Sequence, residues 1–183
     1  MSVFYISDLH IGHENVLKHD NRPFADCKKM HNEIIKRWNN AVKHNDEVYI
    51  LGDFAWKNAE GLEVLCQLTG KKHLILGNHD KPTDEMRTYF ESVSDYLVIN
   101  DSGRQVVLSH YPIAHWYNQY RGAIHLYGHV HATKDYTAFL KYGGICRKLE
   151  IPFNCANVGC MLDYMNYTPR TLEEICKNNN IQF

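Results

Sequence analysis

The sequence predicts an α/β fold, because short apolar runs of strand length alternate with segments of helical periodicity. A short apolar run bounded by turn signals indicates a buried strand. The first three runs are Val3–Ile6, Val48–Leu51 and Leu74–Leu76, and each is followed at once by polar side chains. Open α/β sheets present their active sites at the carboxyl ends of the strands. These polar strand ends are therefore the first candidates for function.

The helices are predicted from capping residues and apolar spacing. Asp26 suits the N-cap of a helix whose apolar stripe has 3.6-residue spacing, with Met30, Ile34, Trp38, Ala41 and Val42 on it. A second helix presents Leu62, Leu65, Cys66 and Thr69 on one face, with Gly70 as its C-cap. Pro82 favours a third helix over residues 82–91. His31 and His44 fall off the first stripe, so we expect both to be solvated.

The second half of the chain begins with a hairpin pattern. Residues 96–99 and 105–108 are apolar runs that flank Asn100-Asp101-Ser102-Gly103, a sequence typical of a turn. A fifth run, residues 124–127, ends in Gly-His-Val-His. Residues 132–150 contain two adjacent glycines and alternate poorly, which favours irregular structure or an edge hairpin.

The C-terminal part of the sequence carries weaker signals. Residues 155–160 resemble a short strand that leads into a loop. Thr171 and Glu174 have the spacing of a capping box, which predicts a short final helix through Ile175 and Cys176.

Length and charge limit the classes of protein to consider. The 183 residues suit one domain over 1–183, and the formal net charge of −1 provides no global attraction for nucleic acid or an anionic membrane. The chain enters a strand at its third residue and contains no apolar run near the ~20 residues of a membrane span. Six scattered cysteines without CxxC spacing indicate reduced thiols rather than a disulfide framework. We expect a cytoplasmic protein.

Five predicted strand ends carry groups that can bind a metal ion. In an isolated strand end, an aspartate and a histidine two residues apart can also form a simple surface hydrogen bond. Seven oxygen and nitrogen ligands are too many for one four-coordinate ion, and they suit two ions that share a carboxylate. Mixed ligands without thiolate favour Mn, Fe, Zn or Ni. The seven candidate ligands are Asp8, His10, Asp53, Asn78, His110, His129 and His131.

The order of these strand ends resembles a known family. The pattern D-x-H at 8–10, GD at 52–53, GNHD at 77–80, His110 and GHVH at 128–131 is similar to the five motif blocks of the calcineurin-like metallophosphoesterases. The NVG at 157–159 and the opening SDLHIGHENV…NRPF resemble small bacterial, archaeal and phage members. The resemblance implies a two-sheet β-sandwich flanked by helices.

The resemblance also assigns a role to each matching position. It implies that Asp53 bridges two divalent ions, with manganese the first expectation. The remaining ligands divide between the two ions: Asp8, His10 and His131 on the first, and Asn78, His110 and His129 on the second. A bridging hydroxide would attack phosphorus in line. His79 would protonate the leaving oxygen, and Asp80 would orient His79.

The substrate is less narrowly predicted than the site. The short chain leaves little room for a cap domain, which favours a phosphodiester and a nucleotide-type substrate. His13 and Arg22 could bind a phosphate, although Arg22 could equally form a structural salt bridge. An aromatic segment could stack on a base or pack in the core, and it contains His115, Trp116, Tyr117 and Tyr120.

Other classes of function remain open at this stage. They are a phosphomonoesterase or phosphoprotein phosphatase, and a metal-bound interaction module without catalysis. A nuclease would normally have a basic groove, and the net charge of −1 argues against one. Oligomeric state is not predicted.

Overall fold

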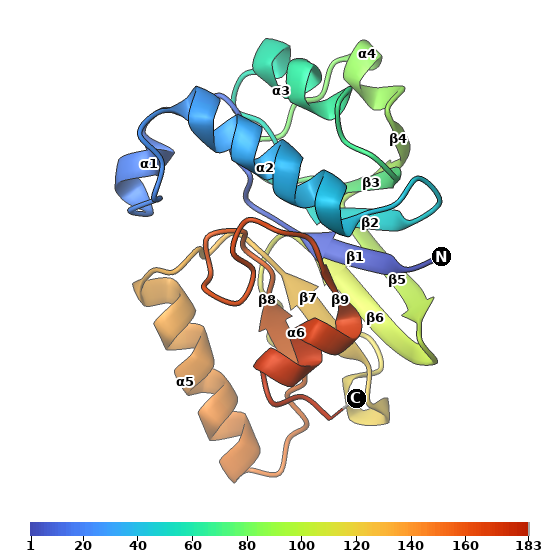
Figure 1. Cartoon of the computed structure of the whole chain (residues 1–183). Helices are drawn as coiled ribbons and strands as arrows, with labels where there is room; N and C mark the ends of the chain where they lie inside the picture. Colours follow the sequence, from blue (N-terminus) through green and yellow to red (C-terminus); the bar gives the residue numbers. More distant parts are fainter. Residues whose placement is uncertain (183) are drawn as a thin grey trace.

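The computed structural model describes residues 1–182, which form two β-sheets with helices on both sides (Figure 1). The first sheet has the strand order β4-β3-β2-β1-β9 and the second has the order β5-β6-β7-β8. The strands are β1 (Val3–Ile6), β2 (Glu47–Leu51), β3 (Lys71–Ile75), β4 (Phe90–Ser94), β5 (Tyr96–Asp101), β6 (Arg104–Ser109), β7 (Ile124–Tyr127), β8 (Cys155–Asn157) and β9 (Arg170–Thr171). The expected two-sheet architecture is confirmed.

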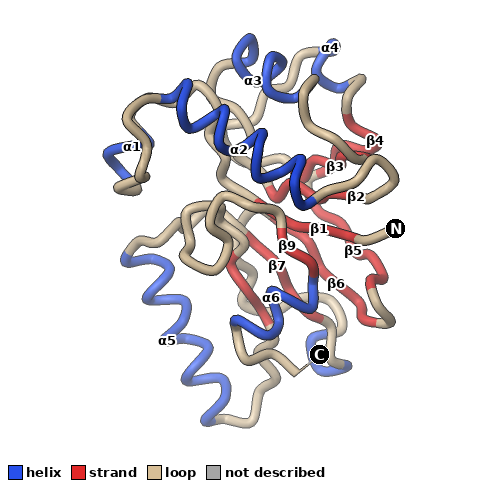
Figure 2. Tube along the Cα trace, in the orientation of Figure 1, coloured by secondary structure: helices blue, strands red, loops and turns tan. Residues whose placement is uncertain are grey.

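The helices lie outside the two sheets. In Figure 2 the strands run through the middle of the molecule and the helices surround them. Helices α2, α3 and α4 lie on the upper side of Figure 1, whereas α5 lies on the lower side. The helices are α1 (Val16–His19), α2 (Cys27–Ala41), α3 (Asn58–Leu65), α4 (Asp84–Arg87), α5 (Lys134–Lys148) and α6 (Leu172–Asn178), with a 3₁₀ turn at Gln119–Arg121.

The two sheets share one hydrophobic core. Ile50 of the first sheet and Leu108 and Leu126 of the second belong to the same buried cluster. Val107 points to the opposite face of its sheet and joins Trp116 in a smaller cluster near α5. Neighbouring residues of a strand face opposite sides, so the second sheet is covered on both faces.

Helix α2 forms as its sequence predicts. The Asp26 carboxylate accepts the backbone N–H of Lys29 at 2.7 Å and caps the first turn. Trp38 is fully buried, and its indole N–H donates to the carbonyl of Thr69 at 2.9 Å. The expectation that His31 is solvated is wrong, because its ring is buried and accepts the backbone N–H of Gly12 at 3.0 Å. His44 is exposed, as expected.

Other helix boundaries differ from the predictions. Helix α3 ends at Leu65, so Cys66 is exposed, and Gly70 lies in the turn before β3 with a φ of +86°. The helix predicted over residues 82–91 is the short α4, followed by the strand β4.

Residues 132–150 contain the helix α5 rather than irregular structure. The Thr133 side chain caps its first turn by accepting the backbone N–H of Asp135. A Cβ at Gly143 would lie 2.6 Å from the ring of Phe153, so the glycine permits close packing of the helix on the loop before β8. The glycine pair that argued against a helix thus includes a residue that the packing of this helix requires.

The hairpin and the final helix are confirmed. Strands β5 and β6 pair antiparallel, and Ser102 and Gly103 turn the chain with φ values of +52° and +78°, as tight hairpin turns require. Thr171 and Glu174 form the expected capping box at the start of α6. No helix within residues 1–182 is long and apolar enough to cross a membrane.

Parallel pairing brings the polar strand ends together. Strands β1, β2 and β3 are mutually parallel, as are β6, β7 and β8, so their carboxyl ends lie together within each sheet. Backbone bonds then join the sheets at this end: Ser7 donates to Val158 and accepts from Cys160, both at 3.0 Å. The loops that carry the candidate ligands therefore meet at one edge of the sandwich.

We predict that Trp38→Ala lowers the free energy of unfolding by about 3–5 kcal/mol, because it leaves a cavity and an unpaired carbonyl. Urea denaturation followed by circular dichroism measures this change. The control is Leu140→Ala, a half-exposed position on α5, where we expect a change within about 0.5 kcal/mol. A similar small change for Trp38→Ala would contradict this account of the core.

Candidate metal centre

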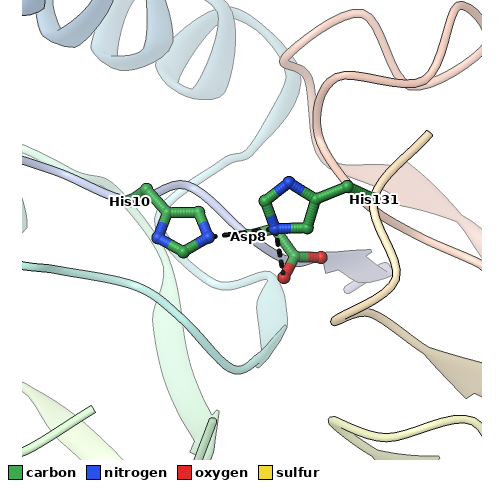
Figure 3. Close-up of side chains that lie close together, drawn as sticks. All are labelled: Asp8, His10 and His131. Atoms are coloured by element: carbon green, nitrogen blue, oxygen red, sulfur yellow. Dashed lines mark hydrogen bonds and ion pairs between the residues drawn. The ribbon is translucent and has the colours of Figure 1, made fainter. Parts of the chain in front are cut away.

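The candidate ligands form two clusters at the edge where the sheets meet. We call Asp8, His10 and His131 the first triad (Figure 3), and Asp53, His110 and His129 the second triad. Within each triad, one nitrogen or oxygen atom of every residue lies within 4.8 Å of the others. Residues as far apart in the sequence as His10 and His131, which are separated by 121 positions, thus converge, as the sequence predicts.

In the first triad, ring nitrogens face one another and a carboxylate. The Nε2 atoms of His10 and His131 are 3.1 Å apart, and Nε2 of His131 is 3.5 Å from Oδ1 of Asp8. Nδ1 of His131 lies 2.7 Å from the Asp20 carboxylate, which fixes the ring proton on Nδ1. The lone pair of Nε2 is then directed into the cluster, where it suits a cation.

The second triad has the same arrangement of ring nitrogens. Nδ1 of His110 donates to the carbonyl of Leu51 at 2.8 Å, so its Nε2 lone pair faces inward. That Nε2 atom lies 3.2 Å from Nδ1 of His129 and 3.1 Å from the amide oxygen of Asn78. Asn78 therefore extends the second triad to four potential ligands.

The Asp53 carboxylate of the second triad also faces the first triad. Its Oδ2 atom is 3.6 Å from Nε2 of His10 and 3.5 Å from Nε2 of His110. Its Oδ1 atom accepts the backbone N–H of His79 at 3.0 Å, and the side chain is almost fully buried. One oxygen thus faces a histidine of each triad, while the other accepts a hydrogen bond from the loop that follows β3.

The carboxylates and imidazoles of the cluster shift one another's pKa values. Burial opposes the charged forms of His110 and His131, but the hydrogen bonds to Asp53 and Asp20 outweigh burial and raise the pKa of both rings. Burial opposes ionisation of Asp53, but the hydrogen bond and positive charge of His110 outweigh burial and lower the pKa of the carboxyl. Burial lowers the pKa of His10 and that of His129, which favours neutral imidazole. Ionised carboxylate and neutral imidazole are the forms that ligate divalent metals.

Several candidate ligands have a backbone conformation that is costly for residues other than glycine. Left-handed φ values are uncommon in non-glycine residues and gather at functional sites. The affected residues are Asp8 (59°), His10 (52°), Asp53 (53°), His129 (69°) and His131 (46°). The sharp turns direct successive side chains of each loop into the same small volume.

Two glycines allow the ligand loops to approach one another. A Cβ at Gly77 would lie 2.3 Å from Oδ1 of Asp53, and one at Gly128 would lie 2.6 Å from Oδ2 of Asp8. Both distances are too short for any side chain. The glycines that precede the GNHD and GHVH ligands therefore provide space for the carboxylates of other loops.

Asp80 differs from its expected role. Its carboxylate accepts backbone N–H groups from Asp53 at 2.7 Å, Phe54 at 2.9 Å and Gly77 at 2.9 Å. These bonds join the β2 and β3 loops, and no hydrogen bond within residues 1–182 joins Asp80 to the ring of His79. Nε2 of His79 instead lies 3.9 Å from Oδ2 of Asp53. The contacts of Asp80 therefore hold the backbone around His79 rather than its ring.

The expectation that Arg22 binds substrate is wrong, because the guanidinium is buried and fully engaged. It forms a 2.8 Å ion pair with Asp20 and donates to the carbonyls of Asp8 and Leu9. This is the structural alternative left open by the sequence. Asp20, which no spacing pattern singled out, links Arg22 to His131.

His13, the other residue expected to contact substrate, lies beside the site. Its ring centroid is 5.6 Å from that of His10. The ring is partly exposed, so contact with a substrate stays a prediction.

The aromatic segment at residues 115–120 is divided between core and surface. Trp116 is buried and donates its indole N–H to the carbonyl of Ala123 at 2.9 Å. Tyr117 and Tyr120 are exposed, and His115 lies 3.4 Å from the hydroxyl of Tyr142. Core packing, the second possibility from the sequence, thus holds for Trp116.

Comparison with known proteins places the chain in a family. The profile of the calcineurin-like phosphoesterase superfamily domain matches residues 1–152. The chain belongs to the calcineurin-like phosphoesterase superfamily. Membership makes phosphate esters the class of substrate and hydrolysis the class of reaction, and members generally use divalent metals.

Individual relatives extend over most of the chain. An uncharacterized protein of Methanocaldococcus jannaschii is 32% identical over 178 residues, which cover 96% of this chain and 89% of the relative. The gene 66 protein of Mycobacterium phage L5 is 29% identical over 163 residues, covering 72% and 78%. A crystal structure of a protein of unknown function from Aquifex aeolicus matches with a TM-score of 0.72 and 27% identity, covering 97% of this chain and 98% of that chain.

We predict that Asp20→Asn lowers the affinity for Mn²⁺ by about 10–100-fold, because an amide orients the His131 ring less strongly than a carboxylate. Isothermal titration of the metal-free protein measures the affinity. Asp163→Asn, at an exposed aspartate, is the matched control and should bind Mn²⁺ as the wild type does. Unchanged affinity in Asp20→Asn would show that His131 needs no orienting carboxylate.

Proposed function

We propose that the protein is a dinuclear-metal-dependent phosphoesterase that hydrolyses phosphodiesters. The position of the Asp53 carboxylate carries this proposal, because Oδ2 lies about equally far from a histidine of each triad. A carboxylate so placed suits a bridge between two ions. In this assignment the first ion takes Asp8, His10, Asp53 and His131, and the second takes Asp53, Asn78, His110 and His129.

The donor set suits divalent cations with mixed oxygen and nitrogen ligands, and Mn²⁺ is our first choice before Fe, Zn or Ni. When bound, two such ions neutralise phosphate oxygens and lower the pKa of bound water. The chain itself supplies the orientation: Asp20 and the Leu51 carbonyl hold the rings of His131 and His110.

His79 is the proposed proton donor to the leaving oxygen. Its side chain is 37% exposed and lies at the rim of the cluster, with Nε2 3.9 Å from Oδ2 of Asp53. A donor at this position reaches a phosphate ester held between the triads without itself belonging to either triad. Proton donation of this kind typically contributes about 10²–10⁴-fold to the rate.

A diester is favoured because two half-exposed aromatic residues lie beside the proposed site. Trp56 and His79 border the first side, and Tyr111, with its ring 4.4 Å from that of His129, borders the second. Trp56 and Tyr111 are about half exposed, at 47% and 50%. An exposed aromatic ring on each side can contact an organic group on each side of the phosphorus.

The test compares ester classes on the metal-loaded chain. After reconstitution with Mn²⁺, we expect bis(p-nitrophenyl) phosphate to be hydrolysed with a higher kcat/KM than p-nitrophenyl phosphate. The reverse preference would identify a phosphomonoesterase or phosphoprotein phosphatase. Hydrolysis of neither ester, with two ions per chain confirmed by elemental analysis, would favour the interaction module.

We predict that Asp53→Ala loses both ions, because one side chain serves both proposed positions. Elemental analysis after gel filtration should give two Mn per chain for the wild type and near zero for the variant. Asp163→Ala controls for the loss of one exposed carboxylate. Two ions still bound to Asp53→Ala would refute the bridging assignment.

We predict that His79→Ala keeps its metal but loses about 10²–10⁴-fold in kcat on a diester with a poor, alkoxide leaving group. The loss should be much smaller on bis(p-nitrophenyl) phosphate, whose phenolate needs little protonation. Steady-state kinetics on both substrates, with metal content checked in parallel, measure the difference. Equal losses on both substrates would remove His79 from the proton-donor role.

A further inference from the structure

Trp56 is a large, half-exposed aromatic residue held beside the proposed proton donor. It follows Asp53 by three positions, and its backbone N–H donates to the carbonyl of Ile11 at 2.8 Å. The His13 ring stacks on the indole with a centroid distance of 4.2 Å and an interplanar angle of 11°. The His79 ring lies 4.7 Å from the indole at 49°. The indole thus has a fixed position at the rim of the site.

A hollow lies next to this indole. It has a volume of about 290 Å³ and is lined by Trp56, Asn58, Asn78, His79 and Lys81. The side-chain amide of Asn58 donates to the carbonyl of Lys81 at 2.9 Å and so joins two of the lining residues. Cavities for drug-sized ligands are roughly 300–1,000 Å³, so this hollow suits a single ring system.

The position of His79 tells which part of a substrate would enter the hollow. A group that protonates the leaving oxygen must lie on the leaving-group side of the phosphorus. Because His79 lines the hollow, the leaving group would extend into it, onto the indole. Trp56 offers stacking to any base, since every base has a π-face. Lys81 adds a positive charge that suits an anionic substrate.

We propose that Trp56, with Asn58 and Lys81, forms a subsite for the nucleobase of the leaving group, so that the substrate is a phosphodiester with a nucleoside leaving group. This inference rests on the proposed phosphodiesterase function. Tyr117 and Tyr120 are more exposed, at 57% and 70%, but no ring contact in the described part of the chain joins either tyrosine to a triad or to His79. Trp56, in contrast, has its ring 4.7 Å from that of the proposed proton donor.

The experiment compares thymidylyl-thymidine with two analogues, one lacking the base of the 5′ nucleoside and one lacking the base of the 3′ nucleoside. For the Mn²⁺-loaded wild type, we expect one of the two analogues to lose roughly 10–100-fold in kcat/KM. In Trp56→Ala, the ratio of kcat/KM for thymidylyl-thymidine to kcat/KM for that analogue should fall to about one. Cleavage of the same abasic analogue should stay close to its wild-type rate.

Controls separate stacking from other roles of Trp56. Trp56→Phe should retain most of the discrimination, and Trp56→Leu replaces Trp56→Ala if the latter does not fold by circular dichroism. Tyr120→Ala, matched as an exposed aromatic residue, should discriminate as the wild type does. An equal loss on intact and abasic substrates in Trp56→Ala would mean that the indole only positions His79, and this would overturn the subsite.

The remaining outcomes also decide the inference. Loss of discrimination in Tyr117→Ala or Tyr120→Ala instead would place the base on that segment and overturn the assignment to Trp56. If the wild type cleaves the intact dinucleotide and both abasic analogues equally well, the subsite is overturned but the phosphodiesterase function stands. No cleavage of any diester by the wild type would overturn both.

Discussion

The Asp53 carboxylate and its surroundings determine how the loops of the site are arranged. Oδ1 accepts the N–H of His79, and the Asp80 carboxylate in turn accepts the N–H groups of Asp53 and Phe54. The β2 and β3 loops are therefore held by two reciprocal carboxylates, while Oδ2 of Asp53 faces the histidines of the other loops. An ionised carboxylate so deeply buried needs compensating positive charge. The same group that joins the loops thus creates the demand for cations.

A second charged pair supports the first triad from behind. Buried Arg22 neutralises Asp20, and Asp20 orients the ring of His131. Arg22 also donates to the carbonyls of Asp8 and Leu9, which steadies the left-handed turn at Asp8. Arg22, for which the sequence left a phosphate contact and a structural salt bridge open, thus shapes the candidate metal centre. Because Arg22 is buried, a positive charge that attracts the substrate must come from exposed residues such as Lys81.

The sequence predicted those features that depend on short-range pattern. Apolar runs of strand length predicted β1, β2, β3 and β7. The polar residues that follow these runs in the sequence were the candidate ligands. Helix α5 was missed because much of its apolar surface, including Leu140, is exposed, so its periodicity is weak. The Asp20–His131 bond spans 111 residues, and the stacking of His13 on Trp56 likewise joins two separate loops. Contacts of this kind exist only once the sheets have packed, so no local spacing reveals them.

The left-handed backbone conformation of the candidate ligands limits how the protein can be stabilised. Each non-glycine residue in this conformation costs roughly 1–2 kcal/mol, and five of the seven candidate ligands adopt it. The sum is comparable with the whole stability of a typical domain, about 5–15 kcal/mol. Glycine would relieve the cost at these positions and remove the ligand at the same time. The backbone cost at these positions is therefore retained because the site needs their side chains, an example of stability given up for function.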